Sequence, residues 1–243
     1  MIHVQSNPRI TLQSEARTQK RAVLKITISK ENYLKAIAEA EAEGETVIAA
    51  TLARWLNVSP PAVTMALRRL KRDDCILVAK DGQIELTAEG RAIADRLLRR
   101  HHLIERMLTE VFGMSWYKVH DEAEQLEHAV SSEFERLLEA KLGKEDSCPH
   151  GNRPGLESPD ERRRRGWVPL FESRAGASVQ LVSVFERDIR LLEYLDGLGL
   201  APGKHFAIVA RNYDDTMSLR VDGGLVQIGR PAAEKVWVFP QES

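Results

Sequence analysis

Hydrophobic positions in the first third of the chain recur at helical spacing. Behind Ser29, a candidate N-cap, apolar residues lie three and four apart along KENYLKAIAEAEAEG. A second short helix is expected over residues 47–56, and a third over residues 59–74. Ser59 can cap the third helix, and Pro60 sacrifices no hydrogen bond in its first turn. The pattern therefore predicts three short helices in this part of the chain.

The third of these helices has a cationic outer face. Its apolar residues form one inward stripe, whereas its Arg and Lys residues lie mainly off that stripe. The run CILVAK-DG-QIELT, residues 75–87, then predicts two strands joined by an Asp-Gly turn. A hairpin directly after the second helix of a helix-turn-helix is a wing. Residues 29–87 are therefore predicted to form a winged helix-turn-helix DNA-binding domain.

Two longer amphipathic helices are expected next. Residues 88–112 form the first and residues 116–142 the second, and a glycine ends each of them. The short loop GMSWY joins them, so we expect them to pack antiparallel. Residues 147–175 are rich in Pro and Gly and contain the tract ERRRR. We interpret that segment as a solvated linker in preference to a nucleic-acid patch.

The last part of the chain has a different pattern. The β-prone runs VQLVSVF, HFAIVA, MSLRV, LVQIG and KVWVF are separated by turn residues, with one short helix expected over residues 187–199. Several short strands in so short a segment predict a small SH3-like β-barrel. The predicted fold class is mainly α with small β elements. Its parts are a basic arm (1–28), the winged domain (29–87), a helical domain (88–146), a linker (147–175) and the barrel (176–243).

The amino-acid composition limits the kinds of binding partner and the cellular compartment that are expected for this chain. The formal net charge is −1, so any nucleic-acid patch must be local. Only Cys75 and Cys148 are present, which excludes a disulfide scaffold and favours a reducing cytoplasm. No apolar run reaches about 18 residues, so no membrane span is expected. Residues 1–28 carry five Lys/Arg against Glu15; we interpret them as an irregular tail, the alternative being an arm along DNA phosphates.

The stretch HDEAEQLEH, residues 120–128, is dense in groups that bind metals. On a continuous helix four of its side chains share an arc of about 100° beside an apolar stripe. These four are His120, Glu124, Glu127 and His128. Carboxylates beside an apolar face repel one another, and a divalent cation reverses that repulsion. Metal binding is therefore favoured over the alternative of a solvated helix face, whereas Glu122 points away and is assigned to solvent.

The preceding helix supplies complementary ligands. His101 and Glu105 lie one turn apart on one face, and antiparallel packing brings that face toward residues 120–128. Imidazole with carboxylate, and no thiolate in the helix, suits Mn²⁺ or Fe²⁺ better than a structural Zn²⁺. Cys148 in CPHG could add a ligand, but we interpret it as an exposed thiol.

These segments resemble the DtxR/MntR family of metal-dependent repressors, from about residue 29 to the C-terminus. The strongest matches are ENYLKAI (31–37), VSPPAVTMALRRL (58–70), LTAEG (86–90), RRHHLIERML (99–108), VHDEAEQLEH (119–128) and CPHGNRPG (148–155). The tail looks like the FeoA/SH3-like domain of the longer members. The resemblance implies a homodimer that, once metal is bound, binds palindromic operator DNA and represses genes of metal-ion homeostasis. It implies no enzymatic activity.

The resemblance also implies two metal sites and a DNA-contacting helix face. The primary site maps onto Glu124, Glu127, His128 and Asn32. The ancillary site maps onto His101, Glu105 and His120, with Asp188 at an acidic position of the C-terminal domain. The DNA-contact positions are Ser59, Pro61, Thr64 and Met65. Arg68 and Arg69 are candidate phosphate contacts, with solvated charge as the alternative.

Three departures from the family pattern bear on the metal. The iron branch has Cys at the position of Glu124, and the harder carboxylate favours Mn²⁺ first and Fe²⁺ second. The small manganese members carry an acidic residue at the position of Lys35, which cannot ligate while charged. Their binuclear site is therefore not expected intact. A second ligand position in the tail falls on Leu191, which cannot ligate.

Three other functions would use the same residues. A metalloenzyme could use Glu124 or Glu127 as a base, but the chain has no HExxH pattern and no nucleophile signature. In a repressor that binds an organic ligand, the His/Glu cluster would be purely structural. A metal buffer would need many more sites than this chain offers.

Overall fold

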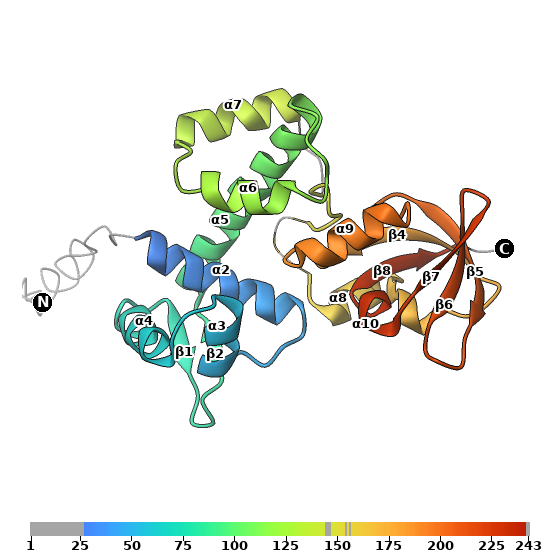
Figure 1. Cartoon of the computed structure of the whole chain (residues 1–243). Helices are drawn as coiled ribbons and strands as arrows, with labels where there is room; N and C mark the ends of the chain where they lie inside the picture. The colour runs from blue at the N-terminus through green and yellow to red at the C-terminus, as the bar shows by residue number, and fades with distance from the viewer. Residues whose placement is uncertain (1–26, 144–146, 154, 156, 242–243) are drawn as a thin grey trace, which may run out of the picture.

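The computed structural model describes residues 27–143, 147–153, 155 and 157–241 (Figure 1). Most of the expected basic arm, up to residue 26, lies outside the described residues. The first domain consists of α2 (Ile28–Ala42), α3 (Ala49–Trp55), α4 (Pro60–Arg72), β1 (Ile76–Val78) and β2 (Ile84–Leu86). The two strands form the antiparallel wing. The N-cap of α2 is Thr27 and not Ser29, because Oγ1 of Thr27 accepts from the backbone N–H of Lys30.

The first domain encloses its own hydrophobic core. Buried apolar side chains from α2, α3, α4, the wing and the start of α5 meet there; they include Leu34, Ile37, Leu52, Leu70 and Ile76. Gly90 lies where α5 begins, and a Cβ at that position would lie 2.0 Å from the carbonyl oxygen of Cys75. A glycine is therefore required for α5 to start directly against the wing.

The middle of the chain contains α5 (Ala88–Arg106), a π-helical turn η1 (Met107–Val111), α6 (Val119–Leu126) and α7 (Ser132–Leu142). In Figure 1, α5 connects the first domain with the α6–α7 pair. The expected single helix over residues 116–142 is wrong, because the chain leaves the helix after Leu126 and restarts when Ser131 caps α7. His128 therefore lies in the connection between α6 and α7.

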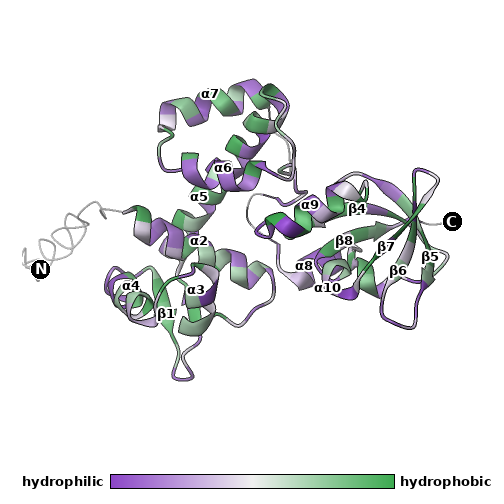
Figure 2. Cartoon of the chain, in the orientation of Figure 1, coloured by the Kyte–Doolittle hydropathy of each residue, from purple (hydrophilic) through white to green (hydrophobic). Residues whose placement is uncertain are grey.

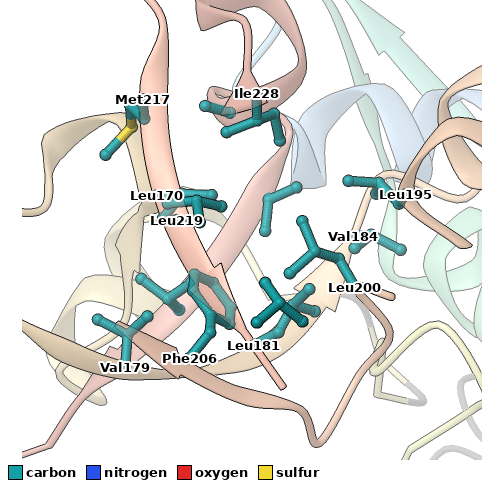
Figure 3. Close-up of a cluster of buried hydrophobic side chains, with 14 of the residues drawn as sticks. Leu170, Val179, Leu181, Val184, Leu195, Leu200, Phe206, Met217, Leu219 and Ile228 are labelled. Atoms are coloured by element: carbon teal, nitrogen blue, oxygen red, sulfur yellow. The ribbon is translucent and has the colours of Figure 1, made fainter. Parts of the chain in front are cut away.

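The C-terminal domain is built on a six-stranded antiparallel sheet of order β3-β8-β4-β5-β6-β7. Its elements are α8 (Pro159–Arg164), β3 (Val168–Pro169), η2 (Leu170–Glu172), β4 (Ser178–Val184), α9 (Ile189–Gly197), β5 (His205–Arg211), β6 (Met217–Val221), β7 (Gly224–Ile228), α10 (Arg230–Ala233) and β8 (Val236–Pro240). Irregular register in β4 and β5 bends the sheet. Its apolar face packs around residues such as Leu181, Phe206 and Leu219, shown in Figure 3. The result is the SH3-like barrel.

The segment that we expected to be a linker contains α8 and β3, and it contacts both the first domain and the C-terminal domain. Arg162, the first arginine of ERRRR, is buried, with its guanidinium 5.1 Å from the centre of the Trp237 ring. The same side chain donates to Glu43, the C-cap residue of α2, at 3.2 Å. Proline and glycine content indicated a solvated connector, but a capping box between Ser158 and Glu161 starts a helix that presents Arg162 inward. None of the helices in the described ranges is long and apolar enough to cross a membrane.

Candidate metal centre

Helices α5 and α6 bring three predicted ligands together in the interior. Nε2 of His101 lies 3.0 Å from Oε1 of Glu105 and 3.1 Å from Nδ1 of His120. All three side chains are buried. The one-turn spacing in α5 places His101 and Glu105 on the same face, and packing of α6 on α5 adds His120. The structure thus brings together the three helical residues of the ancillary set.

The CPHG turn delivers two further groups to this place. Gly151 has φ +81°, and a Cβ there would lie 1.9 Å from the carbonyl oxygen of Val182, so only glycine lets the turn lie against β4. Nδ1 of His150 lies 3.3 Å from Oε1 of Glu105. Cys148 is buried as well, so the expectation of an exposed thiol is wrong. Burial follows from the tertiary contact of the turn with β4, which the Pro/Gly composition does not reveal.

The carboxylate from the C-terminal domain is Glu186, two residues after the end of β4. Its oxygens lie 3.9 Å from His120 and 3.6 Å from both His150 and Cys148. Among the described residues, two groups of four have ligand atoms within 4.8 Å of one another: His101, Glu105, His120 and Glu186, and His102, Glu105, Cys148 and Glu186. We call all of these residues together with His150 the buried cluster.

Asp188, the acidic residue expected from the sequence, does not reach the buried cluster. Its Oδ1 accepts from the backbone N–H of Leu191 and caps α9, whereas its Oδ2 accepts from Nζ of Lys235 at 2.9 Å. Both oxygens are thus engaged in the C-terminal domain itself. Glu186, and not Asp188, is therefore the carboxylate of the C-terminal domain that reaches the buried cluster.

Strong opposite charges are balanced inside the buried cluster. Burial alone would raise the pKa of Glu105, but His150 and His101 outweigh it and hold that pKa well below its usual range. Burial and Glu105 likewise act to raise the pKa of Glu186, and three neighbouring histidines lower it to about 2. Burial and Lys35 act to lower the pKa of His101, but Glu105 and Glu127 prevail and raise it to about 9. Without metal, the carboxylates are ionised and His101 carries a proton.

Several polar atoms of the buried cluster have no hydrogen-bond partner within the described residues. They are Oε2 of Glu105, Nε2 of His150 and both ring nitrogens of His102. A buried polar atom without a partner is costly. A divalent cation among these atoms would satisfy several of them at once, and imidazole, carboxylate and thiol groups are ligands for first-row transition metals. The residues present therefore fit a metal.

A second set of predicted ligands joins α2 to the end of α6. Nε2 of His128 lies 2.7 Å from Oδ1 of Asn32 and 3.5 Å from Oε1 of Glu127. Nδ1 of His128 lies 3.0 Å from Oε2 of Glu31, a residue that the sequence analysis did not single out. Asn32, Glu127 and His128 thus connect the DNA-binding domain to the helical domain, and they offer one nitrogen and two oxygens to a cation.

Glu124, the fourth residue of the predicted primary set, faces other partners. Its Oε1 lies 3.1 Å from Arg187 and 3.7 Å from Nζ of Lys35. Burial acts to raise the pKa of Glu124, but these two cations outweigh it and lower that pKa. Oε1 of Glu124 also lies 3.6 Å from Nε2 of His120, a residue of the buried cluster. The structure therefore brings together Asn32, Glu127 and His128, and leaves Glu124 on the side of the arginine.

The predicted DNA-contact residues lie on one outer face of α4 and its cap. Val63 and Leu70 point into the core, whereas the six predicted positions are exposed: Ser59, Pro61, Thr64, Met65, Arg68 and Arg69. Oγ1 of Thr64 donates to the carbonyl of Pro60 at 3.0 Å. This face combines positive charge with small polar and apolar groups, as required for docking a helix in a major groove.

Known protein families match all three domains. Residues 25–84 match the iron dependent repressor N-terminal DNA binding domain, and residues 87–154 match its metal binding and dimerisation domain. Residues 168–240 match the FeoA domain. Together with the winged fold and the buried cluster, these matches define a metal-dependent transcriptional repressor.

Individual relatives agree with that class. The diphtheria toxin repressor of Corynebacterium jeikeium is 41% identical over 220 residues, covering 82% of this chain and 91% of the relative. The iron-dependent repressor IdeR of Mycobacterium tuberculosis is 36% identical over 189 residues, covering 73% and 82%. A manganese-dependent transcriptional repressor in complex with manganese superimposes with a TM-score of 0.77 at 30% identity, covering 87% of this chain and 100% of that one.

ScaR with bound Zn²⁺ superimposes with a TM-score of 0.72 at 31% identity, covering 86% of this chain and 98% of that one.

The chain belongs to the iron-dependent repressor family, as the DtxR/MntR resemblance implied. This is a family of transcriptional repressors, not of enzymes.

Proposed function

We propose that this protein is a Mn²⁺-activated repressor that binds operator DNA as a homodimer and controls genes of metal-ion homeostasis in the cytoplasm. The observation that carries the proposal is the contact of Asn32 on α2 with His128 beyond α6. This contact joins the DNA-binding domain to the helical domain through groups that ligate metals. A cation held there binds tighter when the two domains are correctly placed, which is the requirement for a regulatory ligand.

Asn32, Glu127 and His128 would hold the regulatory cation, and Glu124 would join them only after leaving both Arg187 and Lys35. When bound, the cation supplies positive charge that neutralises the carboxylates between the domains. Asn32 orients α2, and α2 packs on α3, α4 and the wing, so its position sets the separation of the two recognition helices in a dimer. The buried cluster would hold a second cation through His101, Glu105, His120 and Glu186, with Cys148 and His150 adjacent.

Exposed apolar side chains support the dimer. They lie at the end of η1 and on α6 and α7, and comprise Val111, Phe112, Leu126, Phe134 and Leu137. Figure 2 shows hydrophobic and hydrophilic residues interspersed along α7. Five large exposed apolar residues on one small helical domain mark an interaction surface. A second copy of the chain is the partner that this domain's match to a dimerisation domain favours.

Manganese is preferred over iron because of the ligand types. Oxygen and imidazole ligands predominate in both sets, and Glu124 stands where the iron branch carries a thiolate. The solved manganese-dependent repressor noted above supports the same choice. Fe²⁺ remains the alternative metal, since the iron-dependent repressors are also relatives.

The proposal is tested by selecting operator duplexes from random DNA with the Mn²⁺-loaded protein and comparing mobility shifts across metals. Mn²⁺ should support a specific shift at the lowest concentration, followed by Fe²⁺ under anaerobic conditions. A shift of equal strength in EDTA would overturn a metal-activated repressor. A lower requirement for Fe²⁺ than for Mn²⁺ would overturn only the choice of metal.

A further inference from the structure

Lys35 of α2 is a charged side chain in the interior of the interface between α2, α5 and α6. It is 3% exposed. Its Nζ lies 2.8 Å from Oε2 of Glu127, 3.0 Å from Nδ1 of His101 and 3.7 Å from Oε1 of Glu124. A buried ammonium is destabilising unless its partners compensate for the lost hydration. The carboxylate oxygens of Glu124 and Glu127 supply this compensation, and they are also groups that surround a divalent cation. Protonated His101 is a second cation beside Lys35, and its Nδ1 donates to Oε2 of Glu127 at 2.7 Å.

We propose that the ammonium of Lys35 is a built-in cation that takes the place of a metal ion between α2 and the α5–α6 pair. This inference rests on the proposed metal-activated function. It further specifies the number of metal ions that the interface binds. Oε2 of Glu127 is engaged by Lys35 and His101, whereas Oε1 faces His128 at 3.5 Å. Oε2 of Glu127 is thus occupied by a cation that the chain itself supplies. Oε1 remains available to a metal ion from solution.

Arg187 of the C-terminal domain strengthens this arrangement. It donates to Glu39 at 2.7 Å and to Glu124 at 3.1 Å, and both carboxylates also lie within 4.0 Å of Nζ of Lys35. The carboxylates on the side of Lys35 are therefore already neutralised by two side-chain cations. A metal ion on that side would be repelled by Lys35 and Arg187, and it would have to displace both of these cations from Glu124.

Two consequences follow for the protein without metal. The Lys35 ammonium holds α2 against α5 and α6, so this interface keeps its charge balance before any metal arrives. The open side formed by Asn32, Oε1 of Glu127 and His128 then accepts a single cation. Lys35 thereby sets the number of metal ions at the interface to one.

The test replaces Lys35 by Met, which keeps the length of the chain but removes the charge, and by Gln as a second variant. The control is Lys118→Met, which removes an exposed lysine at the start of α6. Two quantities are measured on full-length protein: the melting temperature in EDTA, and Mn²⁺ bound per chain by equilibrium dialysis with elemental analysis.

Without Lys35, the buried carboxylates lose their cation, so the melting temperature in EDTA should fall by about 5 °C or more. Both Lys35 variants should also bind one more Mn²⁺ per chain than the wild type, while Lys118→Met changes neither quantity. An unchanged melting temperature in EDTA, or an unchanged Mn²⁺ stoichiometry in the variant that folds, overturns the proposal. Failure of the proposed function is distinct, because it would appear as metal-independent DNA binding by the wild type.

Discussion

Arg187, just before α9 of the C-terminal domain, donates to Oε2 of Glu39 in α2 of the DNA-binding domain at 2.7 Å. The same guanidinium reaches Glu124 of α6 and lies 5.3 Å from the centre of the Trp55 ring in α3. One side chain therefore contacts all three domains. Because Glu39 is buried, this contact is less screened by solvent than a surface ion pair.

Replacing Arg187 by Met should weaken the attachment of the C-terminal domain. Loss of the guanidinium leaves the buried Glu39 without its 2.7 Å donor, and we expect the free energy of unfolding to fall by about 1–3 kcal/mol. Denaturant unfolding followed by tryptophan fluorescence measures the change. Arg190→Met, an exposed arginine in α9, is the matched control and should leave stability within about 0.5 kcal/mol. Equal stability of both variants would contradict this role.

The acidic ligand from the C-terminal domain can be identified with a pair of isosteric variants. Glu186→Gln removes a carboxylate from the buried cluster, so Mn²⁺ affinity there should drop by at least about tenfold. Asp188→Asn changes a group that caps α9 and pairs with Lys235, so its Mn²⁺ affinity should match the wild type. Isothermal titration calorimetry distinguishes them. A loss of affinity in Asp188→Asn but not in Glu186→Gln would restore the assignment made from sequence.

Metal uptake should release protons at neutral pH. The pKa of His101 is raised to about 9 in the metal-free protein, and the pKa of His150 is raised too, so at pH 7 a bound metal must displace a proton. Mn²⁺ affinity should therefore increase with pH up to about 9. The heat of binding at pH 7 should vary with the ionisation enthalpy of the buffer. A heat that is identical in all buffers would contradict a protonated His101.

The same raised pKa sets the sign of the pH dependence of stability without metal. Because the pKa of folded His101 lies above the ordinary value of 6.5, its protonation contributes stability that is complete below about pH 6.5. That contribution is lost as the pH rises through about 9. Melting temperatures measured in EDTA should fall as the pH rises from 6 to 9, and a melting temperature that rises over this range would contradict a protonated His101.

Thr64→Ala should separate specific from non-specific DNA binding. Thr64 is exposed on the outer face of α4, where a hydroxyl can reach a base edge or a phosphate. We expect a loss of about 1 kcal/mol in binding to the selected operator and little change with random duplex DNA. Fluorescence anisotropy at fixed salt measures both. Equal losses with the two DNAs would indicate that Thr64 contacts only phosphate.

The winged domain was predictable because its signals are local. Ser59 and Pro60 mark the start of α4, and the Asp-Gly turn fixes the wing between two short strands. Spacing within one helix likewise placed His101 and Glu105 together. Each of these features depends on residues close in the sequence, so no knowledge of the tertiary structure was needed.

Features that depend on tertiary contacts were not predictable. The choice between Glu186 and Asp188 depends on where β4 ends and on α9 using Asp188 as its cap. Burial of Cys148 depends on the close approach of Gly151 to β4. The break of the helix at residues 127–131 separates His128 from Glu124, which a continuous helix would have kept on one face. Short sequence patterns contain no information about these packing choices.

In the proposed function, a cation between Asn32 and His128 couples metal binding to DNA binding. The most direct test is the dissociation constant for the selected operator, measured with wild type and His128→Ala in EDTA and in Mn²⁺. We predict that Mn²⁺ tightens binding by the wild type by at least about tenfold and leaves His128→Ala unchanged. Glu122→Gln, an exposed change on α6, should respond as the wild type does. Equal affinity of the wild type in EDTA and in Mn²⁺, or a full Mn²⁺ response of His128→Ala, would contradict the claim.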